Sequence, residues 1–473
     1  MSNLEVISIE TPNLGDRSYV IGAGATAIVI DPQRDIDRVL DVLDAQGWSP
    51  SHILETHFHN DYVSGGLQLA RLTDASYVVP DGMDISFAAQ QVKDNDEIES
   101  VVGRIRVLHT PGHTPNHVSF AIHRDGHDIA LFTGGSLLFG SVGRPDLLGP
   151  AFTEPLARSQ WKSMQRLPQI VSNDVPVYPT HGFGSFCSAT ATVGTHSTLL
   201  EQMRANPVFH TDEETYIREL IAGLDAFPKY YVYMGPANQL GAGPIDLSLP
   251  RLATADDLVH HLQQGDWVVD LRHRRVFAAD HIHASFSFDV HGNAVTYLGW
   301  LLDWGTPLVL LGADLTEIAI MQRELVRIGI DRPVAYSIGS PADWSSTLAP
   351  RTSYPCVTHQ DLKAAMDADP ALLILDLRRN SEWENGFIRE ARHVPLHALR
   401  DNIADLATWS KEAEKPIWVY CGSGLRAAMG ASILQAANVD VVHVDDDFPL
   451  AAAAGIPIDT PNHAERLGLS YTD

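Results

Sequence analysis

Residues 56–62 read Thr56-His57-Phe58-His59-Asn60-Asp61-Tyr62, a run that places two histidines and an aspartate in one short loop. Imidazole and carboxylate groups spaced this closely are typical ligands of a divalent metal ion. The usual form of the motif is H-x-H-x-D-H, and Tyr62 stands where its final histidine is expected. A phenol ionises only near its usual pKa of about 10, so Tyr62 is a poor replacement ligand. The run therefore predicts a metal site that lacks one ligand.

The residues before this run predict strands and one helix. Short β-rich runs cover Ser18–Gly22, Thr26–Asp31 and Ser51–Thr56, and apolar residues recur at helical spacing over Asp35–Gln46. The histidine motif follows directly on the last of these strands. Because functional loops gather at strand ends in α/β layers, we expect the motif at such an edge.

Two further histidines stand on turns that follow predicted strands. His113 follows Ile105–Leu108 within Thr110-Pro111-Gly112-His113-Thr114, and His181 follows Val175–Tyr178 within Pro179-Thr180-His181-Gly182. Ligands far apart in sequence can reach one ion when their loops share an edge of the fold. The candidate metal ligands are therefore His57, His59, Asp61, His113 and His181.

The composition limits the kinds of partner. The chain has 473 residues, a hydrophobic fraction of 45% and a net charge of −26, which fit roughly two to four globular domains. So acidic a chain is not expected to bind nucleic acid or an anionic membrane, since both attract basic faces. The three cysteines form no disulfide framework, the start lacks a signal peptide, and no apolar run is long enough for a membrane span. We therefore expect a cytoplasmic protein.

Two segments rich in glycine and proline predict linkers. These segments, Gly235–Arg251 and Gly339–Pro355, show little periodicity. They divide the chain into three predicted domains, at about residues 1–246, 247–350 and 351–473.

The second and third of these domains repeat each other. Asp270-Leu271-Arg272 aligns with Asp376-Leu377-Arg378, and an apolar strand precedes each triplet. Each domain then has a second strand, Leu308–Leu311 or Ile417–Tyr420, followed by a turn and a helix. Such βα units predict an α/β fold with a parallel sheet and helices on both faces.

The third domain holds a candidate reactive cysteine. Cys421-Gly422-Ser423-Gly424-Leu425-Arg426 follows a strand and opens a helix predicted over Ala427–Ala437. Glycines let successive N–H groups turn toward the sulfur, while the helix N-terminus and Arg426 add positive charge; both favour the nucleophilic thiolate. We expect Cys421 and Arg426 to be catalytic. The expected substrate-binding residues of this loop are Gly422, Ser423, Gly424 and Leu425.

The second domain lacks this nucleophile. Leu311-Gly312-Ala313-Asp314 occupies the corresponding loop, and an aspartate there would repel an anionic sulfur species. We expect this domain to be inactive and structural, either bridging the outer domains or forming the surface of a homo-oligomer.

The N-terminal domain resembles the metallo-β-lactamase fold family. The resemblance is carried by the histidine motif and by residues 110–114, 132–147 and 179–185. Two elements, Gly143–Leu147 and His181–Ala189, look more specifically like the persulfide dioxygenase branch. It implies an αββα sandwich with His57, His59 and His113 at one metal. Asp61, His181 and positions 62 and 135 would then hold a second metal.

The dioxygenase branch implies a narrower site. There a single iron would bind His57, His113 and a carboxylate at position 135, which is glycine in this chain. By the same resemblance, Arg144 and Asp146 would border the pocket for the substrate thiol. The implied cofactor is one Fe²⁺ per chain, and Zn²⁺ is possible.

Residues 351–473 resemble rhodanese sulfurtransferases through Asp376-Leu377-Arg378, Glu382-Trp383-x-x-Gly386 and the Cys421 loop. The whole order resembles fusions of a persulfide dioxygenase with an inactive and an active rhodanese domain. That resemblance implies O₂-dependent oxidation of a low-molecular-weight thiol persulfide to sulfite. A Cys421 persulfide would then pass sulfur to sulfite and form thiosulfate.

Three alternatives stay open. In the first, the N-terminal domain has lost its metal and the chain is a sulfurtransferase only. In the second, the chain is a metallo-hydrolase, a thioesterase of the glyoxalase II type. The third alternative is a non-enzymatic, sulfide-responsive interaction protein, which would need an unreactive Cys421.

Overall fold

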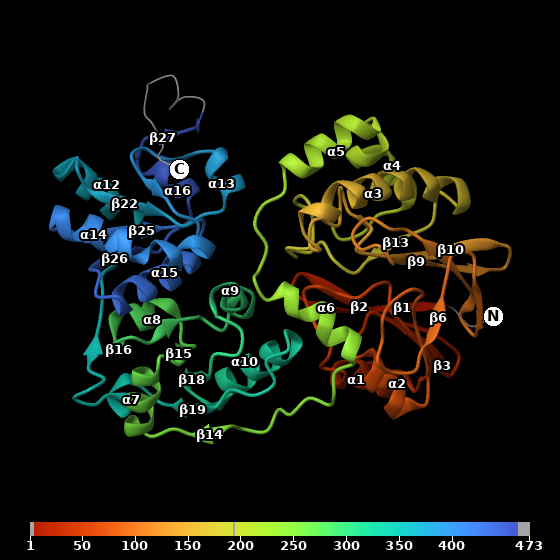
Figure 1. Cartoon of the computed structure of the whole chain (residues 1–473), viewed down its shortest axis with the longest axis horizontal. Helices are drawn as coiled ribbons and strands as arrows, with labels where there is room; N and C mark the ends of the chain where they lie inside the picture. The colour runs from red at the N-terminus through yellow and green to blue at the C-terminus, as the bar shows by residue number, and fades with distance from the viewer. Residues whose placement is uncertain (1–3, 193, 462–473) are drawn as a thin grey trace. The chain divides into compact units, whose positions relative to one another are not determined.

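The chain forms two compact units (Figure 1). The computed structural model describes residues 4–192 and 194–461. Unit 1 comprises Met1–Asp246 and Arg323–Asp331, and unit 2 comprises Leu247–Gln322 and Arg332–Asp473.

Unit 1 is built on two β-sheets. The first has the order β1-β2-β3-β4-β5-β6, with antiparallel pairing from β1 to β3 and parallel pairing from β3 to β6. Its strands are β1 (Glu5–Thr11), β2 (Asp16–Ala23), β3 (Thr26–Ile30), β4 (Ser49–Leu54), β5 (Ser76–Pro80) and β6 (Gln90–Val92). The second has the order β13-β10-β9-β8-β7 and is antiparallel except for β13. Its strands are β7 (Glu97–Ser100), β8 (Gly103–His109), β9 (Val118–Arg124), β10 (His127–Gly134) and β13 (Val177–Pro179), and a small sheet pairs β11 (Leu137–Leu138) with β12 (Ser141–Val142).

Helices cover the outer faces of this pair of sheets (Figure 1). They are α1 (Asp37–Gln46), α2 (Gly66–Thr73), α3 (Pro150–Ile170), α4 (Leu199–Ala205), η1 (Pro207–Phe209), α5 (Glu213–Ala222) and α6 (Tyr231–Leu240). Between the sheets, Tyr19 and Ile28 of the first pack with Phe120 and Phe132 of the second. Apolar residues of α1 and α2 pack on the outside of the first sheet, and those of α3 and α5 on the outside of the second. The predicted αββα sandwich is confirmed.

The predicted linker Gly235–Arg251 is helical over its first residues, which is a correction to the sequence prediction. Helix α6 continues through Gly235 and Pro236 to Leu240. Met234 and Asn238 on this helix are buried, so packing within unit 1 holds a segment whose composition favours a loop.

Unit 2 contains two five-stranded parallel sheets with the same strand order. The first has the order β14-β19-β18-β15-β17, and its strands are β14 (Arg251–Leu252), β15 (Trp267–Asp270), β17 (Phe286–Ser287), β18 (Leu308–Gly312) and β19 (Ala335–Ile338). The second has the order β21-β26-β25-β22-β24, and its strands are β21 (Cys356–Val357), β22 (Leu373–Asp376), β24 (Arg392–His393), β25 (Ile417–Tyr420) and β26 (Val441–Val444). Two small sheets pair β16 (His281–Ile282) with β20 (Arg351–Thr352) and β23 (Phe387–Ile388) with β27 (Ile458–Asp459).

The helices beside these sheets fall into two groups along the chain. Those of the middle region are α7 (Ala255–Gln264), α8 (Arg274–Ala279), α9 (Ala294–Leu301), α10 (Leu315–Arg327) and α11 (Pro341–Trp344). Those of the C-terminal region are α12 (His359–Ala368), α13 (Asn380–Glu384), η2 (Leu396–Ala398), η3 (Arg400–Asn402), α14 (Ile403–Ala413), α15 (Leu425–Ala436) and α16 (Pro449–Ala453). The predicted parallel α/β folds are thus confirmed. Helix α15 begins two residues before the predicted start at Ala427, and α11 lies inside the predicted linker Gly339–Pro355, where Trp344 is buried.

The predicted repeat is present in the side-chain contacts. Arg272 Nη2 donates to Asp270 Oδ2 at 2.6 Å, and Arg378 Nη2 donates to Asp376 Oδ2 at 2.7 Å. The same nitrogen reaches the carbonyl of Asp280 in one copy and of Gly386 in the other. Both arginines therefore fasten the end of a central strand to the next turn.

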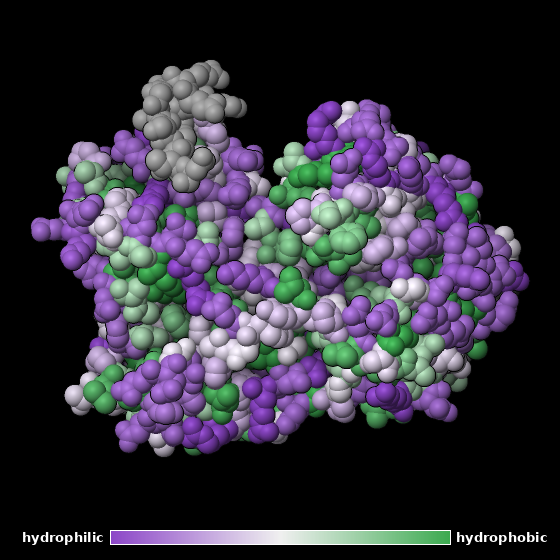
Figure 2. Space-filling view, in the orientation of Figure 1, coloured by the Kyte–Doolittle hydropathy of each residue, from purple (hydrophilic) through white to green (hydrophobic). Residues whose placement is uncertain are grey.

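The exposed surface is largely hydrophilic on the face drawn in Figure 2, where hydrophobic residues form small separate groups. The large apolar side chains that are exposed singly include Leu72, Leu240 and Leu348. Within residues 4–192 and 194–461, no helix has the length and apolar character needed to cross a membrane.

Candidate functional sites

The five predicted metal ligands lie together at one edge of unit 1, and all are fully buried. His57, His59 and Asp61 follow β4, while His113 follows β8 and His181 follows β13. The structure brings one nitrogen each of His57, His113 and His181 within 4.8 Å of one another. Asp61 and His59 form a second group of this kind, again with His181.

Hydrogen bonds set the tautomers of the first group. Thr56 Oγ1 donates its proton to Asp31 at 2.8 Å, so it accepts from His57 Nδ1 at 2.9 Å. His113 Nδ1 donates to the carbonyl of Arg144 at 2.9 Å, and His181 Nδ1 donates to Asp16 at 2.8 Å. His57 and His113 thus carry their proton on Nδ1 and keep the Nε2 lone pair for another partner.

The three Nε2 atoms turn toward a shared space. His57 Nε2 lies 3.2 Å from His181 Nε2, and His113 Nε2 has no hydrogen-bond partner among the described residues. Two lone pairs at that distance repel each other unless a proton or a metal ion lies between them. The donor set therefore fits one divalent ion held by three imidazoles.

The pKa values of these histidines agree with a site in which three imidazoles hold one divalent ion. Burial, with smaller contributions from neighbouring imidazoles, lowers the pKa of His57 well below its usual range and that of His113 to about 3. Burial also opposes the charged form of His181, but the carboxylates of Asp61 and Asp16 outweigh it and raise its pKa. Without metal, His181 therefore carries the proton that an ion would displace.

His59 lies beside His57, with ring centroids 4.2 Å apart, and its Nε2 approaches two buried carboxylates. Its Nε2 lies 3.3 Å from Asp31 and 3.4 Å from Glu55, and these three side chains form a further group with metal-ligand spacing. Burial opposes the imidazolium, but the charge of Asp31 and its contact with His59 raise the pKa of His59 to about 9. His59 thus acts as a buried cation between two acids.

Tyr62 and Gly135 occupy the two unusual positions. Tyr62 stacks on His59 with ring centroids 4.2 Å apart, and burial raises its pKa well above the usual range, so its phenol stays protonated. A Cβ atom at Gly135 would lie 2.3 Å from Cδ2 of His113. The ring of His113 therefore fills the space that a carboxylate side chain at position 135 would need.

Arg144 and Asp146 form a closed pair. Arg144 is 3% exposed, and its Nε and Nη2 each donate to Asp146 at 2.7 Å. Its guanidinium also donates to the carbonyls of Phe186 and Asp225 and lies over the ring of Phe227, 4.8 Å from the centroid. Each of its three nitrogens thus has a protein acceptor, and the substrate contact implied by the resemblance stays a prediction.

Several supporting residues had no motif to mark them. Asp16 orients His181 across 165 positions of sequence, Tyr230 donates to the carbonyl of Asp61 at 2.8 Å, and Asn238 donates to the carbonyls of His59 and Tyr62. Glu55 could have been noticed in the sequence, because it is an acidic residue directly after the apolar end of a strand, where a buried acid is unusual.

The Cys421 loop lies between β25 and α15, as predicted. Cys421 is 1% exposed, and Gly424 has a φ of +84°, which favours glycine at the turn into the helix. The carbonyls of Gly422 and Gly424 point into the protein, where they accept from Phe448 N and His443 Nε2 at 2.9 Å each. These contacts leave the loop N–H groups directed to the other side, where an anionic sulfur species would bind.

Arg426 crosses this loop and is paired with Glu382. The two nitrogens of its guanidinium lie 2.5 and 2.7 Å from the two carboxylate oxygens. Burial opposes the charged carboxylate, but the hydrogen bonds and charge of Arg426 outweigh it and lower the pKa of Glu382 to about 2. An incoming anion must therefore compete with Glu382 for Arg426.

The middle domain packs against the Cys421 loop. A Cβ atom at Gly292 would lie 2.8 Å from Leu425. Burial raises the pKa of Tyr297 on α9, and Arg426 and Cys421 are near enough to influence it. Asp445, which lies under Gly424, accepts from Arg274 Nε at 2.6 Å and is also paired with Arg275. The middle domain thus supports the loop from one side.

The corresponding loop of the middle domain is closed to anions. Asp314 Oδ1 accepts from Thr316 N at 2.7 Å and from Glu317 N at 3.2 Å. Glu317 in turn accepts from Ala313 N at 2.7 Å. In this loop the carboxylates of Asp314 and Glu317 therefore accept from backbone N–H groups that could otherwise bind an anion.

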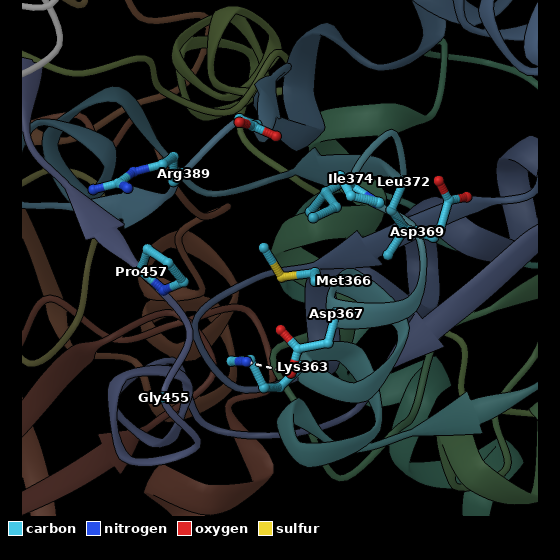
Figure 3. A pocket seen from close by; sticks show the side chains of 11 residues that line it. Lys363, Met366, Asp367, Asp369, Leu372, Ile374, Arg389, Gly455 and Pro457 are labelled. Carbon is cyan, nitrogen blue, oxygen red and sulfur yellow. Dashed lines mark hydrogen bonds and ion pairs between the residues drawn. The ribbon is translucent and has the colours of Figure 1, made fainter.

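A cavity of about 310 Å³ lies elsewhere in the C-terminal region and is shown in Figure 3. Met366, Leu372 and Pro457 give it an apolar lining. Its basic residues are already paired, Lys363 with Asp367 and Arg389 with Asp459. Leu372 lies at the opposite end of the parallel sheet from Cys421, since β22 begins at Leu373 and Cys421 follows the last residue of β25.

Comparison with known proteins identifies both outer domains. The model of the metallo-beta-lactamase superfamily matches residues 14–182, and that of the rhodanese-like domain matches residues 358–451. Hydroxyacylglutathione hydrolase of Methylococcus capsulatus is 36% identical over 176 residues, which are 35% of this chain and 61% of that protein. The enzyme of the same name from Maricaulis maris is 31% identical over 163 residues, 34% of this chain and 59% of its own. The chain thus spans about three fifths of the length of these relatives.

Two solved structures are also similar. A metallo-beta-lactamase from Staphylococcus aureus has a TM-score of 0.64 and 27% sequence identity, covering 72% of this chain and 99% of its own. ETHE1 from Myxococcus xanthus has a TM-score of 0.44 and 26% identity, covering 50% of this chain and 98% of its own. The chain therefore contains an N-terminal metallo-β-lactamase domain with a metal-binding group of residues and a C-terminal rhodanese-like domain. These two domains indicate an enzyme of sulfur metabolism or a metallo-hydrolase.

Proposed function

We propose that the chain oxidises the outer sulfur of a low-molecular-weight thiol persulfide with O₂ and transfers sulfur through Cys421. The observation that carries the first part is the convergence of three Nε2 atoms, from His57, His113 and His181. A ferrous ion bound there would leave coordination positions open for the persulfide sulfur and O₂. The overall reaction converts RSSH, O₂ and H₂O into RSH, sulfite and two protons.

The ligand set favours one ion over the pair of ions that a binuclear hydrolase uses. His181 belongs to both groups of candidate ligands, but its Nδ1 is held by Asp16 and lies 3.1 Å from Asp61. Only its Nε2 remains, and one nitrogen lone pair binds one ion. Gly135 supplies no carboxylate that could bridge two ions.

The second step uses the Cys421 loop. The Cys421 thiolate attacks the outer sulfur of RSSH, so the S–S bond of the carrier breaks, RS⁻ leaves and a Cys421 persulfide forms. Sulfite then attacks the terminal sulfur and leaves as thiosulfate, which regenerates the thiolate. The open loop N–H groups and Arg426 hold the anionic sulfur during both transfers.

The hydrolase remains a second candidate, because the curated relatives named above are hydroxyacylglutathione hydrolases. The two reactions separate in one experiment on anaerobically purified chain loaded with Fe²⁺ or Zn²⁺. O₂ uptake with a thiol persulfide supports the oxygenase, and thioester hydrolysis without O₂ uptake supports the hydrolase.

Two variants assign the steps to their sites. His113→Ala is expected to abolish O₂ uptake and to keep sulfur transfer from thiosulfate. Cys421→Ser is expected to keep O₂ uptake while sulfite accumulates in place of thiosulfate. If the metal-loaded chain showed neither O₂ uptake nor thioester hydrolysis while Cys421 still transferred sulfur, the protein would be a sulfurtransferase only.

A further inference from the structure

A cavity of about 260 Å³ opens beside the histidine motif in unit 1. Phe58 and Asn60 alternate in sequence with the motif ligands, and Thr114 directly follows His113. The other walls come from three separate segments, represented by Asp84, Leu148 and Gly235. Its volume is below the roughly 300–1,000 Å³ of sites that enclose a drug-sized ligand, so it suits a small molecule.

Hydrogen bonds hold the walls of this cavity in place. Helix α6, which contributes Gly235 and Gln239, is fastened to the motif loop through Asn238, whose Nδ2 donates to the carbonyl of His59 at 2.9 Å. Ser86 N donates to the carbonyl of Gln239 at 3.0 Å, which fastens the segment around Asp84 to the same helix. The cavity is therefore a formed site rather than a gap between loops.

The polar lining of this cavity is neutral apart from one acid. Asn60, Thr114, Asn116 and Gln239 bring amide and hydroxyl side chains to it, and Asn60 and Thr114 are 7% and 8% exposed. Amide and hydroxyl groups can both donate and accept hydrogen bonds without adding charge. Such a lining suits the hydroxyl or amide groups of a small molecule.

The charge of the cavity disfavours ligands that carry a carboxylate. Asp84 is the one ionisable residue in its lining within the described part of the chain, and no lysine, arginine or histidine lines it. A carboxylate placed there would lose hydration without gaining a counter-charge, and it would face the like charge of Asp84.

We propose that this cavity binds the carrier part of the persulfide and selects a neutral carrier thiol, rich in hydroxyl and amide groups, over an anionic one such as glutathione. This inference rests on the proposed function, because it places the carrier next to the metal ligands. Asn60 and Thr114 would bind the carrier's oxygens, and Asp84 would exclude carboxylates.

The test measures binding by calorimetry, so that it does not depend on turnover. The probes are the S-methyl thioethers of 1-thio-β-D-glucose, which is neutral, and of glutathione, which carries a net negative charge. Neither has a thiol that could bind a metal or react with Cys421. The full chain is expected to bind the thiosugar about tenfold more tightly, the effect of one unfavourable charge contact.

Variants locate this preference in the cavity. Asp84→Asn is expected to strengthen binding of the glutathione thioether and so to reduce the difference in affinity between the two probes. The control Asp41→Asn makes the same change in charge on the exposed side of α1 and should leave that difference in affinity unchanged. Thr114→Val is expected to weaken thiosugar binding. A Cβ atom at Gly235 meets only Asn60 Oδ1, at 3.9 Å, so Gly235→Leu should fill the cavity and remove binding without unfolding the domain.

The outcomes separate this inference from the proposed function. Selective thiosugar binding without O₂ uptake would retain the cavity and overturn the oxygenase. Equal binding of both probes, tighter binding of glutathione, or no binding of either probe would overturn the neutral-carrier inference. Persistence of thiosugar binding in folded Gly235→Leu would also overturn it, because the ligand would then lie elsewhere.

Discussion

Replacing Glu382 by glutamine should open the Cys421 site to anions while making unit 2 less stable. Glu382 holds both terminal nitrogens of Arg426, and the two side chains are 27% and 11% exposed. Glutamine keeps the shape of the side chain but removes its charge. Arg426 then becomes available to sulfite or thiosulfate, and we expect the KM for the anion to fall about tenfold, or ~1.4 kcal/mol.

The cost in stability follows from the pKa of Glu382. Against burial, the hydrogen bonds and charge of Arg426 lower that pKa from 4.5 to about 2. At about 1.4 kcal/mol per pKa unit, the difference amounts to at most roughly 3.5 kcal/mol. Partial exposure of the pair reduces this, so we expect the variant to lose about 1–2 kcal/mol at neutral pH.

The depressed pKa of Glu382 also defines how the stabilisation by the Glu382–Arg426 pair changes with pH. Because the folded-state pKa is depressed, the stabilisation is present above about pH 4.5 and is lost as the pH falls toward about 2. The difference in free energy of unfolding between the original chain and Glu382→Gln should therefore shrink over that range. Urea titrations at several pH values and steady-state sulfur transfer measure the two effects.

Glu384→Gln provides the matched control, because Glu384 lies on the same short helix, is exposed and makes the same change in charge. It should alter neither the KM nor the unfolding free energy by more than about 0.5 kcal/mol. An unchanged or higher KM in Glu382→Gln would refute the idea that Glu382 competes with the substrate for Arg426.

Three further predictions concern the metal ligands and the support of the Cys421 loop. Asp16→Asn weakens the contact that orients His181, and chelator competition should show about 10–100-fold lower metal affinity; equal affinity would contradict this role. Gly135→Asp and Gly135→Ala both crowd the ring of His113, and each should lower the unfolding free energy of unit 1 by about 1–3 kcal/mol in chemical denaturation. If the aspartate variant alone bound Fe²⁺ more tightly than the original chain, its new carboxylate would be a ligand of the metal. Asp445→Asn removes the partner of two middle-domain arginines and should cost unit 2 about 2 kcal/mol together with sulfur-transfer activity; unchanged thermal unfolding would exclude this supporting role.

Most of the fold was predictable because local patterns and tertiary packing agree. The three strands predicted before the histidine motif all appear as inner strands of the first sheet, as β2, β3 and β4, and β3 has a continuous apolar run. The Asp-Leu-Arg repeat predicted two like domains because the arginine makes the same contacts in each. Helix α6 was missed because Gly235 and Pro236 favour a loop, and only burial against the rest of unit 1 reveals the helix.

The candidate ligands were predictable as residue types, but their grouping was not. The sequence motif favours His57, His59 and His113 as one set, whereas the structure groups His57 and His113 with His181. That difference arises from contacts over long sequence separations, such as Asp16 with His181 and Asp31 with His59. No local pattern shows which way an imidazole on a loop turns, because its partner is chosen by tertiary packing.

The loss of the carboxylate at position 135 has a physical counterpart at Asp16. Asp16 accepts from His181 Nδ1 at 2.8 Å, and a carboxylate bonded to the far nitrogen of an imidazole increases the basicity of the near one. Burial and the neighbouring Asp61 raise the pKa of Asp16 to about 8, whereas, against burial, His181 lowers the pKa of Asp61. The negative charge beside His181 therefore lies mainly on Asp61, and this buried pair of acids reaches the ligand set through His181 instead of through a side chain at position 135. If this is correct, Asp61→Asn should weaken metal binding in chelator competition at least as much as Asp16→Asn does, and unchanged affinity in Asp61→Asn would refute it.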